Sequence, residues 1–292
     1  GLVITQPDRP GGRGMKLQAT PVKRKALELD LEVLETDNVN EKEFLEKIRS
    51  LNPDFIVVVA FGQKLGKEIL EMPRFGCINL HASLLPEYRG ASPIHRAIID
   101  GKEITGVTTM YMAEGWDTGD IIYKEEVRIE DDDTVGTLHD KLAEVGAGLL
   151  LKTLLDIEKG VAPRVEQDHS RASYTGKIDR ETGAIDWRNS SRAINNLVRG
   201  VNPWPGAYTY YRGETIKIWQ TGPVKEDSFS GKGEILPGTI VEADPNNGLI
   251  VKTGDGLIEI IELQIPGRKK MLARNLLNGY TINKGDCFEL KL

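Results

Sequence analysis

One short apolar run limits the possible fold of this chain more than any other stretch. Residues 55–60 read Phe-Ile-Val-Val-Val-Ala, so the centre of the run is continuously β-branched. Such a run is typical of a strand that is buried on both faces of a parallel sheet. It is far shorter than the roughly 20 apolar residues that a membrane-spanning helix needs. The sequence therefore indicates a soluble globular protein with no membrane partner.

Helix and strand patterns alternate around this run. Helical periodicity is present in residues 21–29, 40–51 and 67–72, and strand patterns occupy residues 31–34 and 77–80. Alternation of this kind implies right-handed crossover connections between neighbouring strands. We therefore predict an α/β fold with a Rossmann-like, mostly parallel, doubly wound sheet.

Two of the predicted helices have recognisable starts. Asn40 is expected to be the N-cap of one helix, because Glu43 follows three residues later. Ser92 is expected to be the N-cap of another helix, with Pro93 at its first position. Further strand patterns and one long amphipathic helix follow, at residues 105–112, 120–129 and 135–149.

The character of the sequence changes in its C-terminal third. Short strand patterns recur between glycines and turn pairs, at residues 207–211, 215–219, 238–241, 249–253 and 257–261. Strands of this length and spacing are typical of a small β-barrel, here expected to be OB-like. The expected organisation is an α/β domain at residues 1–160, a linker at 161–180 and a C-terminal β-barrel domain at 181–292.

The segment between Gln6 and Pro21 has three glycines, three prolines and no sustained periodicity. It is therefore predicted to be a long exposed loop. From Gln6 to Lys25 there are six basic residues and one acidic residue, which gives a net charge of +5. Since the whole chain has a net charge of −6, the rest of it carries −11. Concentrated positive charge in an acidic protein favours a local anionic partner. Composition alone is equally consistent with a solvated insertion.

Cysteine and histidine positions favour neither a disulfide nor a metal site. Cys77 lies in a strand pattern and Cys287 near the C-terminus, which is consistent with two buried thiols in a reducing compartment, expected to be the cytoplasm. The histidines show no spacing that is typical of metal ligands. They are His81, His95, His139 and His169, of which His139 is expected on a helix surface.

Polar side chains lie where the predicted strands end. Asn79 and His81 are two residues apart, so both point to the same side of the sheet, and doubly wound sheets bind ligands at this edge. Asp117 follows a neighbouring strand, in a loop between Gly115 and Gly119. An amide donor, an imidazole and a carboxylate that favours the charged imidazole suit acyl transfer through a tetrahedral intermediate. On the residues alone, the alternative is that Asn79 and His81 only anchor a loop.

These residues belong to a longer pattern. Residues 79–86 read Asn-Leu-His-Ala-Ser-Leu-Leu-Pro, with Arg-Gly-Ala at 89–91 and Asp-Thr-Gly-Asp at 117–120. The pattern resembles the folate-dependent formyltransferase family, whose members move a formyl group from 10-formyltetrahydrofolate to an amine. The resemblance implies that Asn79 and protonated His81 stabilise the oxyanion. It also implies that Asp117 keeps His81 charged and helps to relay protons from the attacking amine.

The resemblance further implies a folate site. The implied folate-contacting residues are Phe61, Gly62, Ser83, Leu84, Leu85, Pro86, Ala113, Glu114, Gly115 and Trp116. Pteridines are usually held by backbone groups, so the individual contacts of these residues stay open at this point.

The basic segment resembles the insertion of those family members that act on initiator methionyl-tRNA. In these members the insertion reaches the tRNA acceptor stem, and Arg13 matches its key arginine. The implied tRNA contacts are Arg9, Arg13, Lys16 and Lys23, because basic side chains on phosphates supply affinity and position. The C-terminal part, from Asn202 onward, resembles the domain of the same members that binds tRNA, although sugar formyltransferases also carry such a domain.

Two other functions stay open on the sequence. One is a formyltransferase for an amino sugar or another small amine, and the other is a tRNA-binding protein with a catalytically silent α/β domain. No protein partner is implied, and a monomer is expected. Gly1 begins within a strand pattern, and the family has a strand and a helix before this point, so one central strand is expected to lie outside this sequence.

Overall fold

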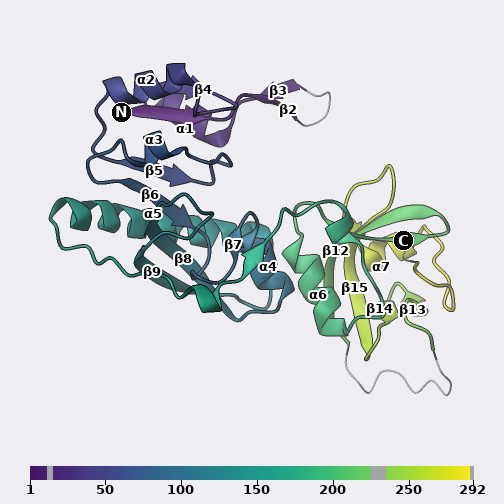
Figure 1. Cartoon of the computed structure of the whole chain (residues 1–292). Coiled ribbons are helices and arrows are strands. Elements are labelled where there is room, and N and C mark those ends of the chain that lie inside the picture. The colour runs from purple at the N-terminus through teal and green to yellow at the C-terminus, as the bar shows by residue number, and fades with distance from the viewer. Residues whose placement is uncertain (12–15, 225–234, 290–292) are drawn as a thin grey trace. The chain divides into compact units, whose positions relative to one another are not determined.

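The computed structural model describes residues 1–11, 16–224 and 235–289, and the chain forms two compact units (Figure 1). Unit 1 comprises Gly1–His81, Thr108–Lys124 and Gly146–Ala172. Unit 2 comprises Ala82–Val107, Glu125–Val145 and Ser173–Leu292. Each unit therefore combines segments that are far apart in the sequence.

Unit 1 holds two sheets besides the short β2/β3 pair described below. In the first, β1 (Leu2–Thr5) pairs in parallel with β4 (Glu32–Glu35). The second has the order β5-β6-β8-β9, and these strands span Ile56–Val59, Cys77–His81, Ile104–Tyr111 and Ile121–Arg128. β6 is parallel to β5 but antiparallel to β8, so the sheet is mixed rather than mostly parallel as predicted. The apolar pattern of a strand reports its burial and not its direction, and β8 is buried along most of its length.

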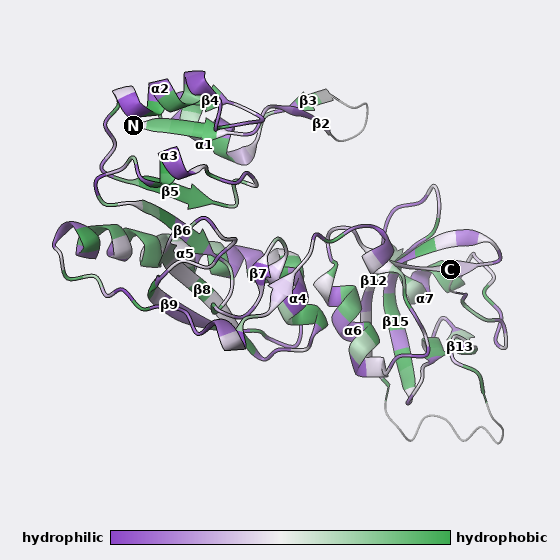
Figure 2. Cartoon of the chain, viewed as in Figure 1, coloured by the Kyte–Doolittle hydropathy of each residue, from purple (hydrophilic) through white to green (hydrophobic). Residues whose placement is uncertain are grey.

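The prediction that residues 55–60 are buried on both faces was wrong. Ile56 and Val58 are half-buried against the cluster that contains Leu65 and Ile69, whereas Val57 and Val59 are 42% and 51% exposed. Figure 2 shows β5 as hydrophobic along its length. β5 stands at the end of its sheet within the described residues, and this explains the exposure, because an end strand has fewer neighbours to cover it. A further strand beside it stays a prediction.

A different helix packs against each face of β6. On one face, α5 (Val135–Glu158) packs closely, because a Cβ added to its Gly146 would lie 2.8 Å from the Leu80 side chain. On the other face, Cys77 packs in the cluster that contains Ile69 of α3 (Lys67–Leu70). Since side chains alternate along a strand, Asn79 and His81 project from the same face as Cys77, away from α5.

Helix starts in unit 1 were predicted with mixed success. α1 (Pro21–Glu28) begins at its predicted proline, and the Thr20 hydroxyl accepts a hydrogen bond from the Lys23 N–H at 3.1 Å. α2 (Lys42–Ser50) has Glu41, not Asn40, at its N-cap. Asn40 instead accepts from the Gly66 N–H at 2.6 Å and donates to the Lys64 carbonyl at 2.9 Å. The amide joins two loops, a role that spacing to Glu43 does not reveal.

The basic segment is a hairpin and not the long irregular loop that the sequence predicted. β2 (Arg9–Gly11) and β3 (Lys16–Gln18) pair in antiparallel fashion, with Pro10 opposite Leu17. Figure 1 shows the hairpin extending away from β1, β4 and α1. Each strand has only three residues, too few for an alternating pattern to be recognised.

Unit 2 is built on an antiparallel sheet, and its five predicted C-terminal strands are all present. The order is β11-β12-β15-β14-β13 with β16 beside β15, over Ala207–Tyr211, Glu214–Pro223, Leu257–Gln264, Gly248–Lys252, Ile240–Asp244 and Met271–Leu272. One buried cluster joins the sheet to α6 (Ser191–Gly200) and α7 (Ala273–Leu277). The remaining elements of this unit are α4 (Pro93–Ile99, with Ser92 as predicted N-cap), β7 (Arg89–Gly90), β10 (Tyr174–Thr175) and the 3₁₀ turn η2 (Glu181–Gly183).

The C-terminal sheet does not close into a barrel within the described residues. Its hydrogen-bonded path ends at β11 on one side and at β13 on the other. Near the C-terminus, Glu289 forms an isolated bridge with Tyr210 of β11, and Cys287 forms one with Thr239, next to β13. The sequence predicted the strands correctly, but closure depends on pairing between distant segments, which no local pattern encodes.

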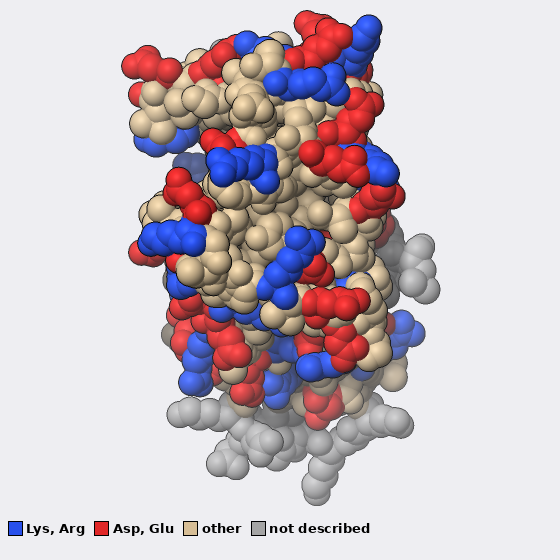
Figure 3. Space-filling view, turned by 60° about the vertical axis from the view of Figure 1, so that its left-hand side comes forward, with Lys and Arg blue, Asp and Glu red and all other residues tan. Residues whose placement is uncertain are grey.

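Charged side chains are dispersed over the surface in view in Figure 3. Lys and Arg alternate there with Asp and Glu around an uncharged area, so the described residues of that face form no continuous basic surface. In the described part of the chain, no helix is both long and apolar enough to span a membrane.

Asp133 gives a prediction about stability, because it fixes the start of α5. Its side chain is 3% exposed and accepts hydrogen bonds of 2.8 Å from the Glu130 N–H, the Thr137 hydroxyl and Lys141 Nζ. Burial acts to raise the pKa of this carboxyl, but the hydrogen bond from Lys141 and those from Glu130 and Thr137 together hold the pKa below 3.8. A carboxyl with a lowered pKa stabilises the fold above its unfolded pKa and loses this contribution as the pH falls through its folded pKa.

We therefore expect Asp133→Asn to lower the free energy of unfolding by about 1–3 kcal/mol at pH 7, and by less at pH 3, which lies below the unfolded pKa of the carboxyl. Urea denaturation at both pH values measures the difference. Asp140→Asn is the matched control, because the Asp140 side chain is 87% exposed on the same helix. An equal loss at both pH values would show that the charge of Asp133 does not contribute.

Candidate active site

The structure places the three predicted catalytic side chains close together in unit 1. Asn79 Nδ2 donates a hydrogen bond of 3.3 Å to Asp117 Oδ1. His81 Nδ1 lies 3.7 Å from Asp117 Oδ2, so the two form an ion pair when the imidazole is protonated. Asp117 thus holds both polar side chains of β6 with one carboxylate. That these groups catalyse a reaction stays a prediction at this point.

Strand geometry explains the positions of Asn79 and His81. Asn79 pairs with Met110 and His81 with Thr108 across the antiparallel ladder between β6 and β8. Both project from the face of β6 opposite α5, at the carboxyl end of the strand, and they are only 8% and 7% exposed. Polar side chains buried to this degree need polar partners, and Asp117 is one of them.

Asp117 reaches this position because of the shape of its loop. Its backbone has a φ of +52°, a left-handed conformation that costs a residue with a side chain roughly 1–2 kcal/mol. A Cβ on Gly119 would collide with the carbonyl oxygen of Tyr111 at the end of β8, so only glycine fits there. The loop is therefore held in a close and strained approach to β8, which directs the Asp117 carboxylate towards β6.

Gln167 is a residue of this site that the sequence did not reveal. It lies in the segment predicted as a linker, is 4% exposed, and donates from Nε2 to the carbonyls of Asp117 at 2.9 Å and Gly119 at 2.7 Å. Nearby, Val165 forms an isolated bridge with Ile121, which brings this segment alongside β9. A single glutamine without periodic neighbours carries no signal in the sequence that could have identified it.

The predicted folate-contacting residues are found in both units. In unit 1, Gln6 Nε2 donates to the Phe61 carbonyl at 2.9 Å beside Gly62, while Ala113, Glu114, Gly115 and Trp116 are all exposed, Trp116 by 57%. In unit 2, Ser83 and Leu85 are fully buried, and Leu84 and Pro86 are half-buried. The Ser83 hydroxyl donates to the Glu87 carbonyl at 2.6 Å. The side chains of Ser83 and Leu85 therefore shape their loop from inside, and Trp116 offers an exposed aromatic surface.

The predicted tRNA-contacting residues have different surroundings. Arg9 is exposed on β2, and Lys16 lies in β3. Lys23 Nζ pairs with Asp8 at 2.9 Å and Glu35 at 2.7 Å. The hydrogen bond that Lys23 donates to Glu35, followed by the one it donates to Asp8, raises the pKa of Lys23, so this side chain braces the base of the hairpin against β4. Arg13 lies outside the described residues.

The remaining histidines and the cysteines were predicted to have no part in the site. Cys77 is buried as predicted, whereas Cys287 is exposed. His139 is exposed on α5, as predicted, and His169 lies in the 3₁₀ turn η1 (His169–Arg171). Burial lowers the pKa of His95, partly offset by a hydrogen bond with the Trp204 backbone. Burial also raises the pKa of the Cys77 thiol to about 12. Among the described residues, no group of three or more His, Cys, Asp or Glu side chains has an arrangement that could hold a metal ion.

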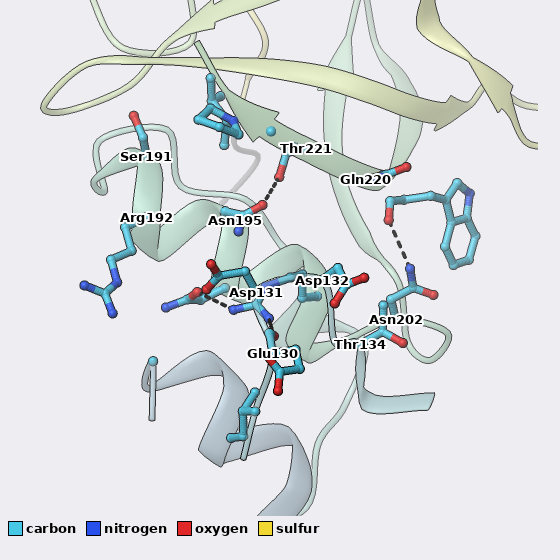
Figure 4. Close-up of a pocket in the computed structure, with 18 of the residues that line it drawn as sticks. Glu130, Asp131, Asp132, Thr134, Ser191, Arg192, Asn195, Asn202, Gln220 and Thr221 are labelled. Atoms are coloured by element: carbon cyan, nitrogen blue, oxygen red, sulfur yellow. Dashed lines mark hydrogen bonds between the residues drawn. The ribbon is translucent and has the colours of Figure 1, made fainter. Parts of the chain in front are cut away.

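A cleft of about 940 Å³ lies in unit 2 and contains none of the predicted site residues. Figure 4 shows the polar side chains that line it, among them Asn195, which accepts a hydrogen bond of 2.9 Å from Thr221. The acidic residues Glu130, Asp131 and Asp132 line the cleft together with Arg192 and other residues of α6. Its lining has five acidic and four basic side chains, so the cleft has no excess of positive charge for a polyanion and we assign no tRNA contact to it.

Comparison with known proteins gives a consistent family. The family model for formyl transferase matches residues 1–154, and that for the formyl transferase C-terminal domain matches residues 177–281. A methionyl-tRNA formyltransferase from Halothermothrix orenii is 61% identical over 284 residues, which cover 97% of this chain and 90% of the relative. A methionyl-tRNA formyltransferase from Clostridioides difficile is 50% identical over 283 residues, with the same two shares.

Solved structures show the same fold at low sequence identity. HypX from Aquifex aeolicus, solved in complex with tetrahydrofolic acid, aligns with a TM-score of 0.64 at 17% identity, over 99% of this chain and 50% of that chain. The sugar 3N-formyltransferase WlaRD, solved in the presence of dTDP and 5-N-formyl-THF, aligns with a TM-score of 0.62 at 16% identity, over 92% of this chain and 98% of that chain.

Proposed function

The chain belongs to the formyl transferase family, and from this premise we propose that it transfers the formyl group of 10-formyltetrahydrofolate to the α-amino group of initiator methionyl-tRNA. The observation that carries the chemistry is the contact of Asp117 with both Asn79 and His81. The identity of the amine is supported by the two methionyl-tRNA formyltransferases, which match nearly the whole chain.

The site suits a formyl donor, because it offers hydrogen-bond donors and a proton carrier in a mostly buried position. When bound, 10-formyltetrahydrofolate supplies a carbonyl carbon that bonds to the amine nitrogen as its bond to N10 breaks, and one proton moves from the amine to N10. Asn79 Nδ2 has a second N–H besides the one directed at Asp117, and this group donates to the formyl oxygen. No residue of the chain has to act as a nucleophile.

His81 and Asp117 have complementary roles in this proposal. Protonated His81 donates to the formyl oxygen as negative charge develops there, and preorganised donors of this kind often supply most of the rate enhancement in acyl transfer. The Asp117 carboxylate, 3.7 Å from His81 Nδ1, stabilises the imidazolium and accepts a proton from the attacking amine. Phe61, Gly62, the loop residues 83–86 and the exposed segment 113–116 are the proposed folate contacts.

The hairpin β2/β3 is the proposed contact with the tRNA acceptor stem. Arg9 and Lys16 belong to its two strands and Arg13 lies between them in the sequence, so three basic residues are available for phosphates, whereas Lys23 acts mainly by bracing its base through Asp8 and Glu35. The C-terminal domain is the proposed second tRNA contact. We keep the expected domain limits of 1–160, 161–180 and 181–292 as part of the proposal.

Three finer statements are proposed with it. The C-terminal sheet is inferred to be an OB-like barrel in which the end of the chain links the two outer strands, as the bridges of Glu289 and Cys287 suggest. The protein is inferred to act as a monomer in the cytoplasm, where its two free thiols stay reduced.

A side-by-side assay of acceptors tests the proposal. The protein and 10-formyltetrahydrofolate are incubated with initiator methionyl-tRNA, with free methionine and with a nucleotide-linked amino sugar, each at equal concentration. We expect formylation of the tRNA-bound methionine to be faster than that of either small amine by at least about 100-fold, because phosphate contacts supply most of the affinity. Formylation of the amino sugar alone would replace the proposal by the sugar-modifying alternative.

Loss of Arg13 is expected to weaken tRNA use and not folate use. Arg13→Ala should raise the KM for methionyl-tRNA about 10-fold, leave the KM for the folate within about twofold, and reduce the salt dependence of tRNA use by about one unit of slope. Initial rates at several salt concentrations measure both effects. Lys25→Ala is the matched control, because Lys25 is an exposed basic residue on α1, paired with Glu28. Equal losses for both substrates would mean that the hairpin only supports the fold.

A further inference from the structure

Gln167 lies outside the predicted catalytic motif, and its side chain contacts the loop that carries Asp117. Gln167 donates both protons of one amide nitrogen, to the carbonyls of Asp117 at 2.9 Å and of Gly119 at 2.7 Å. The same nitrogen lies 3.9 Å from the Met110 sulfur. Met110 pairs directly with Asn79 across the sheet, so Gln167 contacts the loop and the neighbouring strand together.

The loop needs such support. Asp117 holds a left-handed backbone conformation, and strained residues of this kind persist only where their surroundings fix them. Gly119 is pressed against the Tyr111 carbonyl on one side, and Gln167 binds the Gly119 carbonyl from another. The carbonyls of Asp117 and Gly119 both accept from the buried amide of Gln167. Moving them apart would break hydrogen bonds that water cannot easily replace at a buried position.

From this geometry we propose that Gln167 is a positioning residue, which keeps the Asp117 carboxylate at its distance from Asn79 and His81 without touching the substrates. This inference rests on the proposed function. In Asp117 the carboxyl carbon is only three bonds from the carbonyl carbon whose oxygen accepts the hydrogen bond from Gln167. A shift of the loop by about 1 Å would disturb both contacts of Asp117, and misplacement of that size costs up to about 100-fold in rate.

Gln167→Met is the variant that tests the proposal. Methionine has a similar length and volume to glutamine but donates no hydrogen bond, and a buried sulfur beside Met110 is tolerated. We expect kcat for formyl transfer to methionyl-tRNA to fall about 10- to 100-fold, with the KM of each substrate within about threefold of wild type. Gln167→Glu, which directs oxygen at both carbonyls, is expected to lose at least as much.

Two controls separate positioning from loss of stability. Ile157→Ala removes a buried side chain of α5 on the opposite face of the sheet, so it lowers the melting temperature and should leave kcat within about twofold. In a double-mutant cycle, Gln167→Met added to Asp117→Asn should lower kcat by no more than about twofold further, because the group that it positions is already disabled. Losses that multiply, or a fall in kcat that follows the melting temperature as in Ile157→Ala, would overturn the proposal.

A measurement independent of turnover keeps the two inferences apart. Hydrogen exchange followed by mass spectrometry should show faster exchange of residues 113–120 in Gln167→Met, with α5 unchanged. Unchanged exchange in this segment would refute the positioning role whatever the substrate is. If the wild-type protein does not formylate methionyl-tRNA, the proposed function is refuted. Faster exchange of residues 113–120 in Gln167→Met would still support the positioning role of Gln167 in that case.

Discussion

Replacement of His81 by alanine is expected to lower kcat for formyl transfer to methionyl-tRNA by about 10²–10⁴-fold, the range typical of a lost acid–base group. His81 is 7% exposed at the carboxyl end of β6, and its Nδ1 faces Asp117 at 3.7 Å. Alanine removes both the donor to the formyl oxygen and the partner of the carboxylate. Initial rates at saturating concentrations of both substrates measure the effect.

His139→Ala is the matched control for this variant. Its imidazole is exposed on α5, and its Nδ1 lies 3.1 Å from Oδ1 of the neighbouring Asp140. We expect His139→Ala to keep kcat within about twofold and His81→Ala to retain a melting temperature close to that of wild type. Turnover by His81→Ala at the wild-type rate would exclude His81 from the chemistry.

Asp117→Asn is expected to have the second largest effect, a fall in kcat of about 10²–10³-fold. The substitution preserves the size and the left-handed loop position of the side chain but removes the charge that stabilises protonated His81. It also removes the proposed acceptor for the proton of the attacking amine. Single-turnover rates with prebound substrates separate this loss from changes in binding.

Asp156→Asn is the control with the same chemical change in the same unit. Asp156 lies in α5, on the opposite face of the sheet, and pairs with Lys152 and Tyr123. Its replacement should leave kcat within about twofold. If Asp117→Asn changed only the KM values, Asp117 would serve in binding and not in the chemical step.

The part of the site that could be predicted from sequence is the part that one strand encodes. Asn79 and His81 share a face because side chains alternate along β6, and that alternation is visible in the residues themselves. The loop that carries Asp117 could also be placed after β8, because glycines mark it on both sides. For these residues, the local pattern and the folded arrangement agree.

Other parts depend on partners that lie far away in the chain. The exposure of Val57 and Val59 follows from the place of β5 at the end of its sheet, although their residue types indicate burial. Asn40 joins two loops through Lys64 and Gly66, more than 20 residues away, where spacing indicated a helix cap. Gln167 reaches Asp117 across 50 residues. None of these contacts has a period or a spacing that the residues alone could reveal.

The most direct test of the central claim follows the formyl carbon itself. In a single turnover, excess protein is mixed with initiator methionyl-tRNA and 10-formyltetrahydrofolate that is labelled in its formyl carbon. We predict that the label appears on the α-amino nitrogen of methionine in an amount equal to the tetrahydrofolate released, and that His81→Ala gives none on the same time scale. Release of the label as formate, with the methionyl-tRNA unmodified, would contradict the proposed function.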